Sequence, residues 1–407
     1  MPLRRRHHFT PLTRLTLLLV LTLPACTGPR HRVERDLEEG VPRVRTLGAP
    51  RHRGAPFRLV REQVFGDPAL GAEGMLTQPR GYLEVPGGLA VFDDGDRSLK
   101  VYEEDGSLRF RMGRRGQGPG EFEDVWMNHG LSPQGRIVIT DGTNARITLV
   151  DPADGSYEGI PMSGWVTWDA AQVGPDRFVI IHASFSEQWG QLESLDRVDR
   201  SLTVVDTVAS VPPGRVLRVA VPVEGGRTSS VNVSKPFWPF FSWWTQGSRI
   251  AICRGATFRV ELFDLQGRKE RILEWDAPLA AVTDSMWAAT QRTVLRTYGI
   301  YGPTVWTALE RPERVPSVEG VRLDDAGRVW ALRYIPSERY GGPADPNLYW
   351  DVLDADGTWL GLQPTPGVAR YFGRDVCYVT EDTQEGSVVV RYRLEPVSSN
   401  PDRSSTR

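Results

Sequence analysis

The chain has 407 residues, and its 49 Lys and Arg nearly balance its 51 Asp and Glu, for a formal net charge of -2. This balance excludes the clustered positive charge on which nucleic-acid binding depends, so no nucleic-acid partner is expected. The 31 Pro, 41 Gly and 13 Trp are spread along the chain, which favours a turn-rich, all-β domain over disorder.

The first 25 residues have the pattern of a secretory signal peptide. Four Arg and no acidic residue accompany an apolar run over residues 15–23, which is shorter than the roughly 20 residues of a spanning helix. The Leu-Pro-Ala-Cys that follows resembles a bacterial lipobox, and this implies cleavage before Cys26 and its lipidation. Two or more acyl chains anchor a protein stably. Thr27, rather than Asp, resembles an outer-membrane sorting signal.

The mature protein is therefore expected in the cell envelope, lipid-anchored at the outer membrane or facing the periplasm. Without residues 1–25 its formal charge falls to -6, because four Arg are lost. Ordinary secretion with a spare cysteine is the alternative. Residues 26–56 are rich in Arg, Pro, Gly and Glu without an apolar period, which predicts a disordered tether, either solvated or touching anionic headgroups. Residues 397–407 are expected to form a disordered tail.

Six similar pairs of β-rich runs follow within residues 57–396. The first runs are expected at Leu89–Phe92, Ile137–Thr140, Phe178–His182, Arg249–Cys253, Val329–Tyr334 and Val376–Thr380. The second runs are expected at Leu99–Tyr102, Ile147–Val150, Leu202–Val205, Phe258–Phe263, Leu348–Leu353 and Val388–Tyr392. Since a small antiparallel sheet cannot bury both faces alone, these units predict a six-bladed β-propeller. Phe57–Phe65 has no hairpin of its own, so we predict that it completes the last blade.

The span from residue 57 to residue 396 is longer than six ordinary propeller repeats need, so insertions are expected. Residues 212–237 separate the third and fourth pairs, and residues 278–316 separate the fourth and fifth. Within the second insertion, Asp284–Arg296 contains helix formers, with Thr283 or Asp284 as N-cap and Gly299 after the end. One short helix is predicted there, outside the ring.

Two motifs resemble a known family. Asp141, Asn144 and Arg146, followed by Ile147, resemble the blade signature of NHL-type propellers. The loop Gly113–Phe122 resembles a segment of bacterial six-bladed propeller lipoproteins, through Gly116, Gly118, Pro119, Gly120, Glu121 and Phe122. The resemblance implies the propeller fold. We expect the loop to be a shaped turn in which Glu121 caps backbone amides and Phe122 enters the core, and we expect Asp141 and Arg146 to pair within the protein.

Catalytic signatures are mostly missing from the sequence. Four of the six His lie in the signal or tether, so a three-histidine zinc site cannot form in the folded region. No metal-protease, lipase or Walker motif occurs, and no cofactor is implied. Two aspartate groups, Asp93, Asp94 and Asp96 or Asp354 and Asp356, either bind calcium or form turns. Cys253 and Cys377 either pair or stay free.

The candidate ligand-binding residues are two histidines and three tryptophans, namely His129, His182, Trp238, Trp243 and Trp244. His129 is expected where an inner strand begins at the central channel, and His182 at the mouth of its hairpin. The tryptophans belong to the aromatic block over residues 237–244, in which alternate side chains either pack between blades or line a groove. Trp165, Trp168 and Trp189 extend the same rim in this interpretation.

Together these features predict a lipid-anchored, monomeric ring that binds an envelope protein or a carbohydrate on one face. The alternative is a metal-dependent propeller enzyme, either a lactonase-like hydrolase or an amidating-type lyase. Fold alone does not decide between them.

Overall fold

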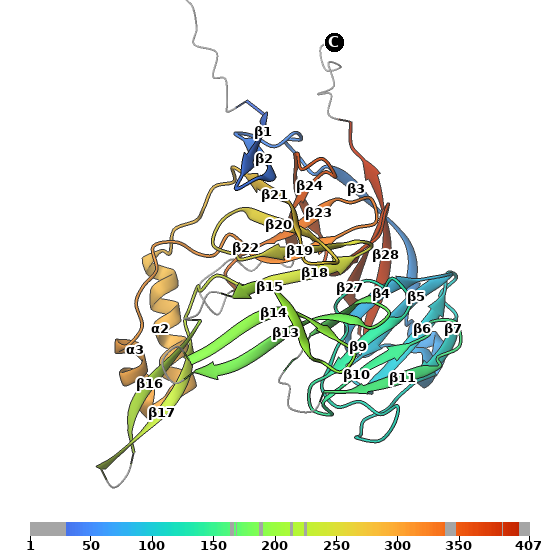
Figure 1. The fold of residues 1–407 in the computed structure, drawn as a ribbon, viewed down its shortest axis with the longest axis horizontal. Coiled ribbons are helices and arrows are strands. Elements are labelled where there is room, and N and C mark those ends of the chain that lie inside the picture. Colours follow the sequence, from blue (N-terminus) through green and yellow to red (C-terminus); the bar gives the residue numbers. More distant parts are fainter. Residues whose placement is uncertain are drawn as a thin grey trace, which may run out of the picture.

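The computed structural model describes residues 30–162, 167, 169–186, 190–211, 215–223, 226–337, 347–384 and 386–398. The predicted signal peptide and Cys26 lie outside these residues, as do Trp165, Trp168 and Trp189. Within them the chain forms a ring of six four-stranded antiparallel blades (Figure 1), so the predicted six-bladed β-propeller is confirmed. No helix among these residues is long and apolar enough to cross a membrane.

Each blade runs outward from its first strand, and the first strands of several neighbouring blades contact one another around the centre. Blade 1 contains β4 (Pro79–Val85), β5 (Gly88–Asp93), β6 (Ser98–Glu103) and β7 (Leu108–Met112). Blade 2 contains β8 (Val125–Trp126), β9 (Ile137–Asp141), β10 (Arg146–Val150) and β11 (Tyr157–Pro161). Blade 3 contains β12 (Ala170–Gly174), β13 (Arg177–Ser186), β14 (Gly190–Asp199) and β15 (Val204–Val211).

The second half of the ring follows the same plan. Blade 4 contains β18 (Ser242–Gln246), β19 (Arg249–Cys253), β20 (Arg259–Asp264) and β21 (Lys269–Trp275). Blade 5 contains β22 (Val318–Leu323), β23 (Val329–Arg333), β24 (Leu348–Leu353) and β25 (Trp359–Thr365). Blade 6 contains β26 (Val368–Phe372), β27 (Val376–Asp382), β28 (Ser387–Pro396) and β3 (Phe57–Phe65).

The ring closes as the sequence predicts, because β3 pairs antiparallel with β28 from Phe57↔Pro396 to Phe65↔Val389. Both ends of β3 are buried side chains, Phe57 and Phe65. Phe57 stacks on Trp330 of blade 5, with ring centroids 5.7 Å apart. The strand therefore joins blade 6 through its backbone and blade 5 through its first side chain.

The prediction of a disordered tether over residues 26–56 is wrong for its central part. Residues 32–47 form a hairpin of β1 (Arg32–Glu38) and β2 (Val41–Leu47), and β2 pairs parallel with β21, which extends blade 4 to six strands. Val44 is buried against the core, and the Thr46 hydroxyl accepts a hydrogen bond from the Trp359 amide at 3.0 Å. The charged composition suggested a solvated linker, but the charges pair across strands instead.

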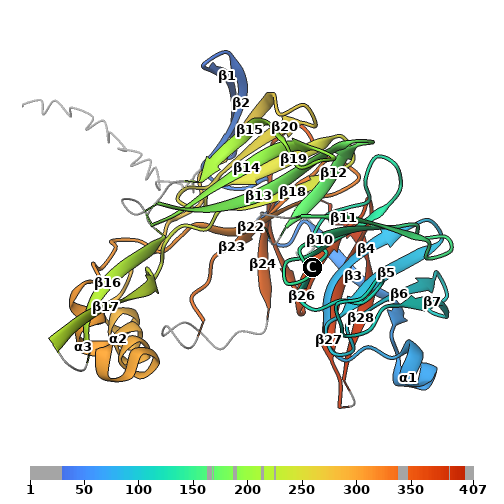
Figure 2. The same cartoon turned by 60° about the horizontal axis from the view of Figure 1, so that its bottom comes forward.

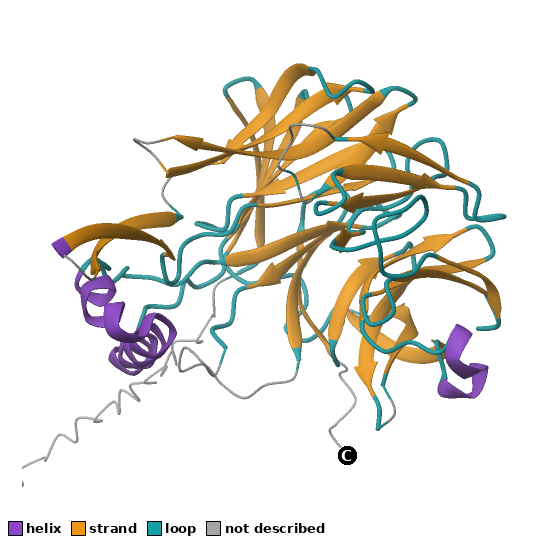
Figure 3. Ribbon diagram, turned by 90° about the horizontal axis from the view of Figure 1, so that it is seen from below, coloured by secondary structure: helices purple, strands orange, loops and turns teal. Residues whose placement is uncertain are grey.

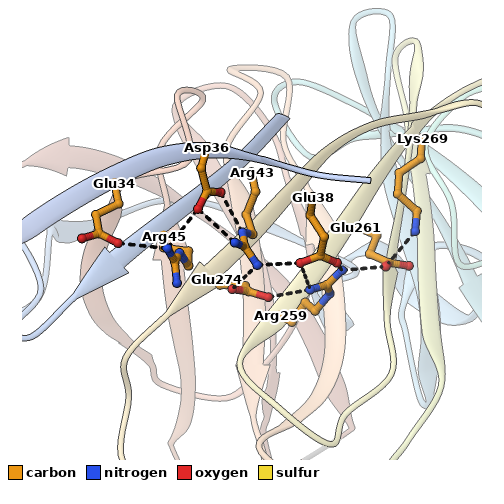
Figure 4. Close-up of polar contacts among 9 residues, drawn as sticks. All are labelled: Glu34, Asp36, Glu38, Arg43, Arg45, Arg259, Glu261, Lys269 and Glu274. Carbon is orange, nitrogen blue, oxygen red and sulfur yellow. Dashed lines mark hydrogen bonds and ion pairs between the residues drawn. The ribbon is translucent and has the colours of Figure 1, made fainter. Parts of the chain in front are cut away.

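Figure 4 shows this network of charges on the extended sheet. Arg43 bonds Asp36 at 2.8 Å and Glu38 at 2.6 Å within the hairpin. Arg259 of β20 bonds Glu38 at 2.6 Å and Glu274 of β21 at 2.5 Å, which ties the hairpin to the blade. These ion pairs are partly exposed, and solvent weakens such pairs, so they add little to the free energy of unfolding. Their main effect is to fix the position of the hairpin on the blade.

One strand prediction is also wrong. In blade 3 the partner of β13 is β14, which ends before the run at Leu202–Val205 that the sequence favoured. Leu202 lies in the β14–β15 turn with φ 63°, and Val204 begins the next strand. The error arises because β14 has few apolar residues, spaced three apart at Leu192, Leu195 and Val198, instead of a strand's alternation.

The two insertions form one unit beside the ring (Figures 2 and 3). The first forms a hairpin of β16 (Val216–Val223) and β17 (Arg227–Ser234). The second forms the predicted helix α2 (Asp284–Tyr298), capped by the Thr283 hydroxyl at the Met286 amide, then η3 (Gly299–Tyr301) and α3 (Gly302–Thr307). Val219 and Val221 of the hairpin share an apolar cluster with Val294 and Val305 of the helices. We call β16, β17, α2, η3 and α3 the inserted unit.

Two further features complete the fold. A short helical segment, η1 (Pro68–Leu70) and α1 (Gly71–Gly74), connects β3 to β4. Cys253 on β19 and Cys377 on β27 are buried and free, so they do not form a disulfide. Burial raises the pKa of each thiol to about 12, which keeps both sulfurs as unreactive thiols at neutral pH.

Candidate functional site

The two family motifs lie together between blades 1 and 2, where the residues of one motif bind the backbone of the other. The Glu121 carboxylate accepts the Gly118 amide at 2.8 Å, and Phe122 is fully buried edge-on against Phe92, which confirms the predicted cap and core roles. Gly116 has φ 154°, which other residues rarely adopt, and a Cβ there would lie 2.2 Å from the Glu121 carboxylate, so a side chain at this position would strain the backbone and displace Glu121. Gly120 also has positive φ, 71°, and Pro119 lies between these residues.

The blade signature holds this loop from the opposite side. Asn144 donates to the Gly116 carbonyl at 2.9 Å and Arg146 to the Gly118 carbonyl at 2.9 Å. Asp141 is buried and accepts the amides of the residues at 123 and 124, at 2.9 and 3.2 Å. Asp141 and Arg146 thus each bind backbone groups of the preceding loop. These four hydrogen bonds give the signature residues a structural role.

Asp93 binds backbone amides in the same way in blade 1, where calcium binding was one interpretation of the sequence. Its oxygens accept the amides of Thr77 at 3.0 Å and Gln78 at 2.7 Å. The Lys100 ammonium lies 2.8 Å from the same carboxylate, and both side chains are buried. The second aspartate group caps a turn, with Asp356 accepting the Thr358 amide. Across the described residues no three His, Cys, Asp or Glu side chains gather as a metal site requires.

His129 is buried and follows β8, the innermost strand of blade 2, instead of beginning an inner strand as expected. Its Nδ1 accepts the Thr245 amide of blade 4 at 3.2 Å, and the next residue, Gly130, donates to the Thr245 carbonyl at 3.1 Å. The chain after β8 therefore reaches from blade 2 across to the innermost strand of blade 4. His129 Nε2 lies 3.2 Å from the Asp169 carboxylate, at the start of blade 3.

Trp243 and Trp244 surround this histidine, with ring centroids 4.0 and 5.4 Å from the imidazole. Trp243 packs between blades 3 and 4, among Ala171, Ile181 and Ile252. Trp244 is 2% exposed and donates from Nε1 to the side-chain oxygen Oε1 of Gln246 at 3.1 Å. Three of the five candidate residues thus come together at the centre, where the two tryptophans are core side chains.

His182 stands apart from this group, on the second strand of blade 3. Its Nδ1 lies 3.5 Å from the Asp196 carboxylate, which also accepts the hydroxyls of Ser194 and Thr207 at 2.8 and 2.7 Å. Asp196 is buried. The surroundings of His182 are thus an internal hydrogen-bonding cluster of blade 3.

Trp238 is the candidate residue that lines a cavity. A pocket of about 380 Å³ lies where the inserted unit meets the ring, lined by Leu217, Ala256, residues 235–239 and most of residues 308–316. Eleven of its fifteen lining residues are apolar, and four of those are prolines. Because proline lacks an amide donor and has a fixed φ, these segments make stiff walls that do not join a sheet. We call this cavity the insertion pocket.

The charged groups of the insertion pocket are Lys235, Glu310, Arg311 and Arg314. The Lys235 ammonium lies 4.5 Å from the centroid of the Trp238 ring. Arg311 is held away from a ligand, because it bonds the Asp284 carboxylate at 2.6 Å and the Val282 carbonyl at 2.5 Å. Three cations and one carboxylate give the pocket an excess positive charge.

Sequence reasoning found Trp238 but missed the opposite wall over residues 308–316. That wall was recognised only as part of an insertion, although its two arginines beside Pro312 and Pro316 are a visible signal. It also missed Arg322 and Arg370, two arginines within the innermost strands of blades 5 and 6. A charge inside a mostly apolar strand was the available clue.

Comparisons with known proteins find no matching family model and no matching curated protein. Among solved structures, a Bacteroides fragilis protein is 8% identical over 83% of this chain and 95% of its own, with a TM-score of 0.49. A member of the DUF4221 family from Bacteroides vulgatus is 13% identical over 84% and 99%, with a TM-score of 0.47. A gluconolactonase from Xanthomonas campestris is 14% identical over 85% and 98%, with a TM-score of 0.38. Such likenesses concern the fold and not the activity.

Proposed function

We propose that this six-bladed propeller is a binding module of the bacterial cell envelope, whose ligand enters the insertion pocket. The observation that supports this most directly is the pocket itself, about 380 Å³ of mostly apolar lining with a few charged groups. Small-molecule sites are typically cavities of about 300–1,000 Å³ with that composition. The walls belong to the inserted unit and to segments that enter blades 4 and 5, so the ring supports them.

The lining favours a small ligand with an apolar body and one anionic group. Trp238 and Leu309 supply apolar surface, and Lys235 and Arg314 supply positive charge. In the described part of the chain Lys235 has the Trp238 ring as its neighbour and no carboxylate partner. A neutral carbohydrate fits less well, because a sugar needs several uncharged hydrogen-bonding groups beside an aromatic face.

Binding is tested by titrating the mature chain with a panel of aromatic and aliphatic carboxylates while tryptophan fluorescence and heat are recorded. Trp238→Ala and Lys235→Gln are each expected to weaken binding by about tenfold or more. Arg268→Gln is the control, because Arg268 pairs with Asp264 in an exposed turn of blade 4. Equal affinity in the wild type and in both pocket variants contradicts the proposal. If only neutral sugars bind, the ligand of the insertion pocket is a carbohydrate.

The anchor is a separate part of the proposal and rests on the sequence before residue 27. Cells that express the full chain are labelled with a palmitate analogue, and the label is expected on the wild type and not on Cys26→Ser. The wild type is expected in the outer-membrane fraction. A wild type that carries no label and is recovered from the medium contradicts the anchor and leaves the pocket untouched.

The alternative of a metal-dependent hydrolase or lyase has no observation in its favour here. Within the described ranges, His129 contacts Asp169 at the start of blade 3 and His182 contacts Asp196 on β14, and these residues form no shared ligand set. Elemental analysis of the mature chain tests this alternative directly, since stoichiometric calcium or a transition metal would support it.

A further inference from the structure

Two arginines meet on the innermost strands of neighbouring blades. Arg322 of β22 donates from Nε to the Arg370 carbonyl of β26 at 3.0 Å. Its guanidinium also lies 4.2 Å from the centroid of the Trp244 ring on β18 and donates to the Val321 carbonyl at 2.8 Å. Arg370 has a buried Nε without a hydrogen-bond partner in the structure. Both side chains keep some accessible surface, so they are not sealed in the core.

No acidic side chain forms an ion pair with either arginine among the residues that the structure describes. The charge of Asp169 acts on Arg322 and offsets part of the repulsion, but the Asp169 carboxylate is in contact with His129 Nε2, at 3.2 Å. The Tyr82 hydroxyl donates to the Val368 carbonyl at 2.7 Å, and burial raises its pKa to about 12, so it carries no charge at neutral pH. Glu319 of the same strand as Arg322 is exposed and forms no ion pair in the described region.

Two like charges in this position are unfavourable without a counter-charge. Burial, and next the charge of Arg370, lower the pKa of Arg322 to about 10. Even so, Arg322 stays protonated at physiological pH, so the pair keeps both charges. Removing water from a charge without an opposite charge beside it is unfavourable. Carbonyl groups and the Trp244 ring offset part of this cost but carry no negative charge.

We propose that the central channel binds a small oxyanion, a carboxylate or a phosphate-like group, between Arg322 and Arg370. The planar guanidinium forks match such oxygens in pairs, which makes arginine the usual residue for both groups. The Arg370 Nε, buried and without a partner, is a donor that the anion would satisfy. This site is independent of the insertion pocket, since neither arginine lines that pocket.

The proposal is tested on the mature chain by calorimetry and thermal unfolding with inorganic phosphate, acetate and citrate, at constant ionic strength set with chloride. One phosphate or one carboxylate per chain is expected, with a saturable rise in the unfolding temperature that chloride does not reproduce. The comparison of phosphate with the carboxylates identifies which oxyanion the site prefers. Absence of binding by all three anions overturns the proposal.

Variants locate the anion. Arg370→Gln is expected to weaken binding by about tenfold or more, and Lys235→Gln in the insertion pocket is expected to leave it unchanged. Arg322→Lys keeps the charge but loses the fork, so weaker binding is expected there too. If Arg370→Gln does not fold, Arg322→Lys carries the test. Unchanged affinity in the arginine variants, or loss of binding in Lys235→Gln alone, overturns the assignment to the channel.

Discussion

Blades 1 and 2 differ from the part of the ring between blades 3 and 5 in how they use polar residues. In blades 1 and 2, Asp93 and Asp141 each receive backbone amides from the segment that enters the blade. Between blades 3 and 5 the chain leaves the ring twice to build the inserted unit, and cations such as Lys235 face a cavity. The repeated part satisfies its polar groups internally, and the unrepeated part leaves charged side chains at the wall of a cavity.

This difference explains why the most recognisable motif is not the best candidate site. Glu121, Asn144 and Arg146 are recognisable because each must bond a fixed backbone group of the loop between the blades. Their hydrogen-bonding capacity is used within the protein. The insertion pocket and the arginine pair show no repeat, so only the structure brings their residues together.

The largest expected loss of stability is at the buried Asp93–Lys100 pair in blade 1. Asp93→Ala removes the carboxylate that pairs with Lys100, which is 1% exposed. Loss of one partner of a buried pair typically costs about 3–5 kcal/mol, because the other charge remains buried. Urea unfolding of the mature chain measures the change. Asp96 lies 3.0 Å from the Lys100 ammonium, so the lower end of this range is expected.

The matched control for Asp93→Ala is an exposed aspartate in an ion pair. Asp206 pairs with Arg197 on the outer strands of blade 3, and its side chain is 43% exposed. Asp206→Ala is expected to change the free energy of unfolding by less than about 1 kcal/mol. Similar decreases in the free energy of unfolding of the two variants would show that burial does not determine how much the Asp93–Lys100 pair stabilises the protein.

Deletion of residues 30–47 is expected to have the next largest effect. The ring keeps six complete blades without β1 and β2, so it should still fold. Loss of buried Val44 removes about 2 kcal/mol of apolar burial, and the Trp359 amide loses its acceptor Thr46. The exposed ion pairs add little. Thermal unfolding measures the decrease, and unfolding of the whole chain would show that the hairpin is part of the ring's closure.

Strand periodicity predicted most of the ring, because β-rich runs separated by turns can be recognised from neighbouring residues in the sequence. The closing strand Phe57–Phe65 followed from counting, since the last unit lacked one strand. The β1–β2 hairpin escaped prediction because its stability comes from a parallel pairing with β21, more than two hundred residues away in sequence. A charged segment of this kind appears solvated until its partner strand is known.

The candidate site was predicted only in part, for a related reason. His129 was expected at the start of an inner strand, whereas it follows the innermost strand β8 and contacts Thr245 of blade 4. The sequence does not distinguish Trp238 from Trp243 and Trp244. An aromatic block shows which residues are apolar, but it does not show which of their side chains are buried by other parts of the protein. Arg322 and Arg370 lie 48 positions apart, so their contact depends on the neighbouring positions of β22 and β26.

The pH dependence of the Asp93 contribution gives a smaller and more specific effect. Burial alone would raise the pKa of Asp93, but hydrogen bonds from Lys100 and the Gln78 amide outweigh it, and the net pKa lies below 3.8. A carboxyl whose folded pKa is depressed stabilises the protein above its unfolded pKa. This contribution disappears as pH falls through the folded pKa, by at most about 1.4 kcal/mol per pH unit.

The stability difference between wild type and Asp93→Asn should therefore be constant from neutral pH down to about pH 4 and then narrow. Urea unfolding of both proteins across this range measures it, and the subtraction removes the other titrating groups that the two proteins share. A difference that widens with acid would mean that the pKa of Asp93 is raised in the folded state.

The smallest expected effect on stability is at the insertion pocket. Variants there distinguish a residue that borders a cavity from a residue that is packed in the core. Trp238 is half-buried and borders a cavity, so Trp238→Ala should cost no more than about 1 kcal/mol while it weakens ligand binding. Trp244 lies six positions later and is fully packed, so Trp244→Ala should cost about 3–5 kcal/mol. Thermal unfolding of the two variants compares the same chemical change in both settings. Equal losses would mean that Trp238 supports the fold as Trp244 does, and the insertion pocket would then be a packing defect between the inserted unit and the ring.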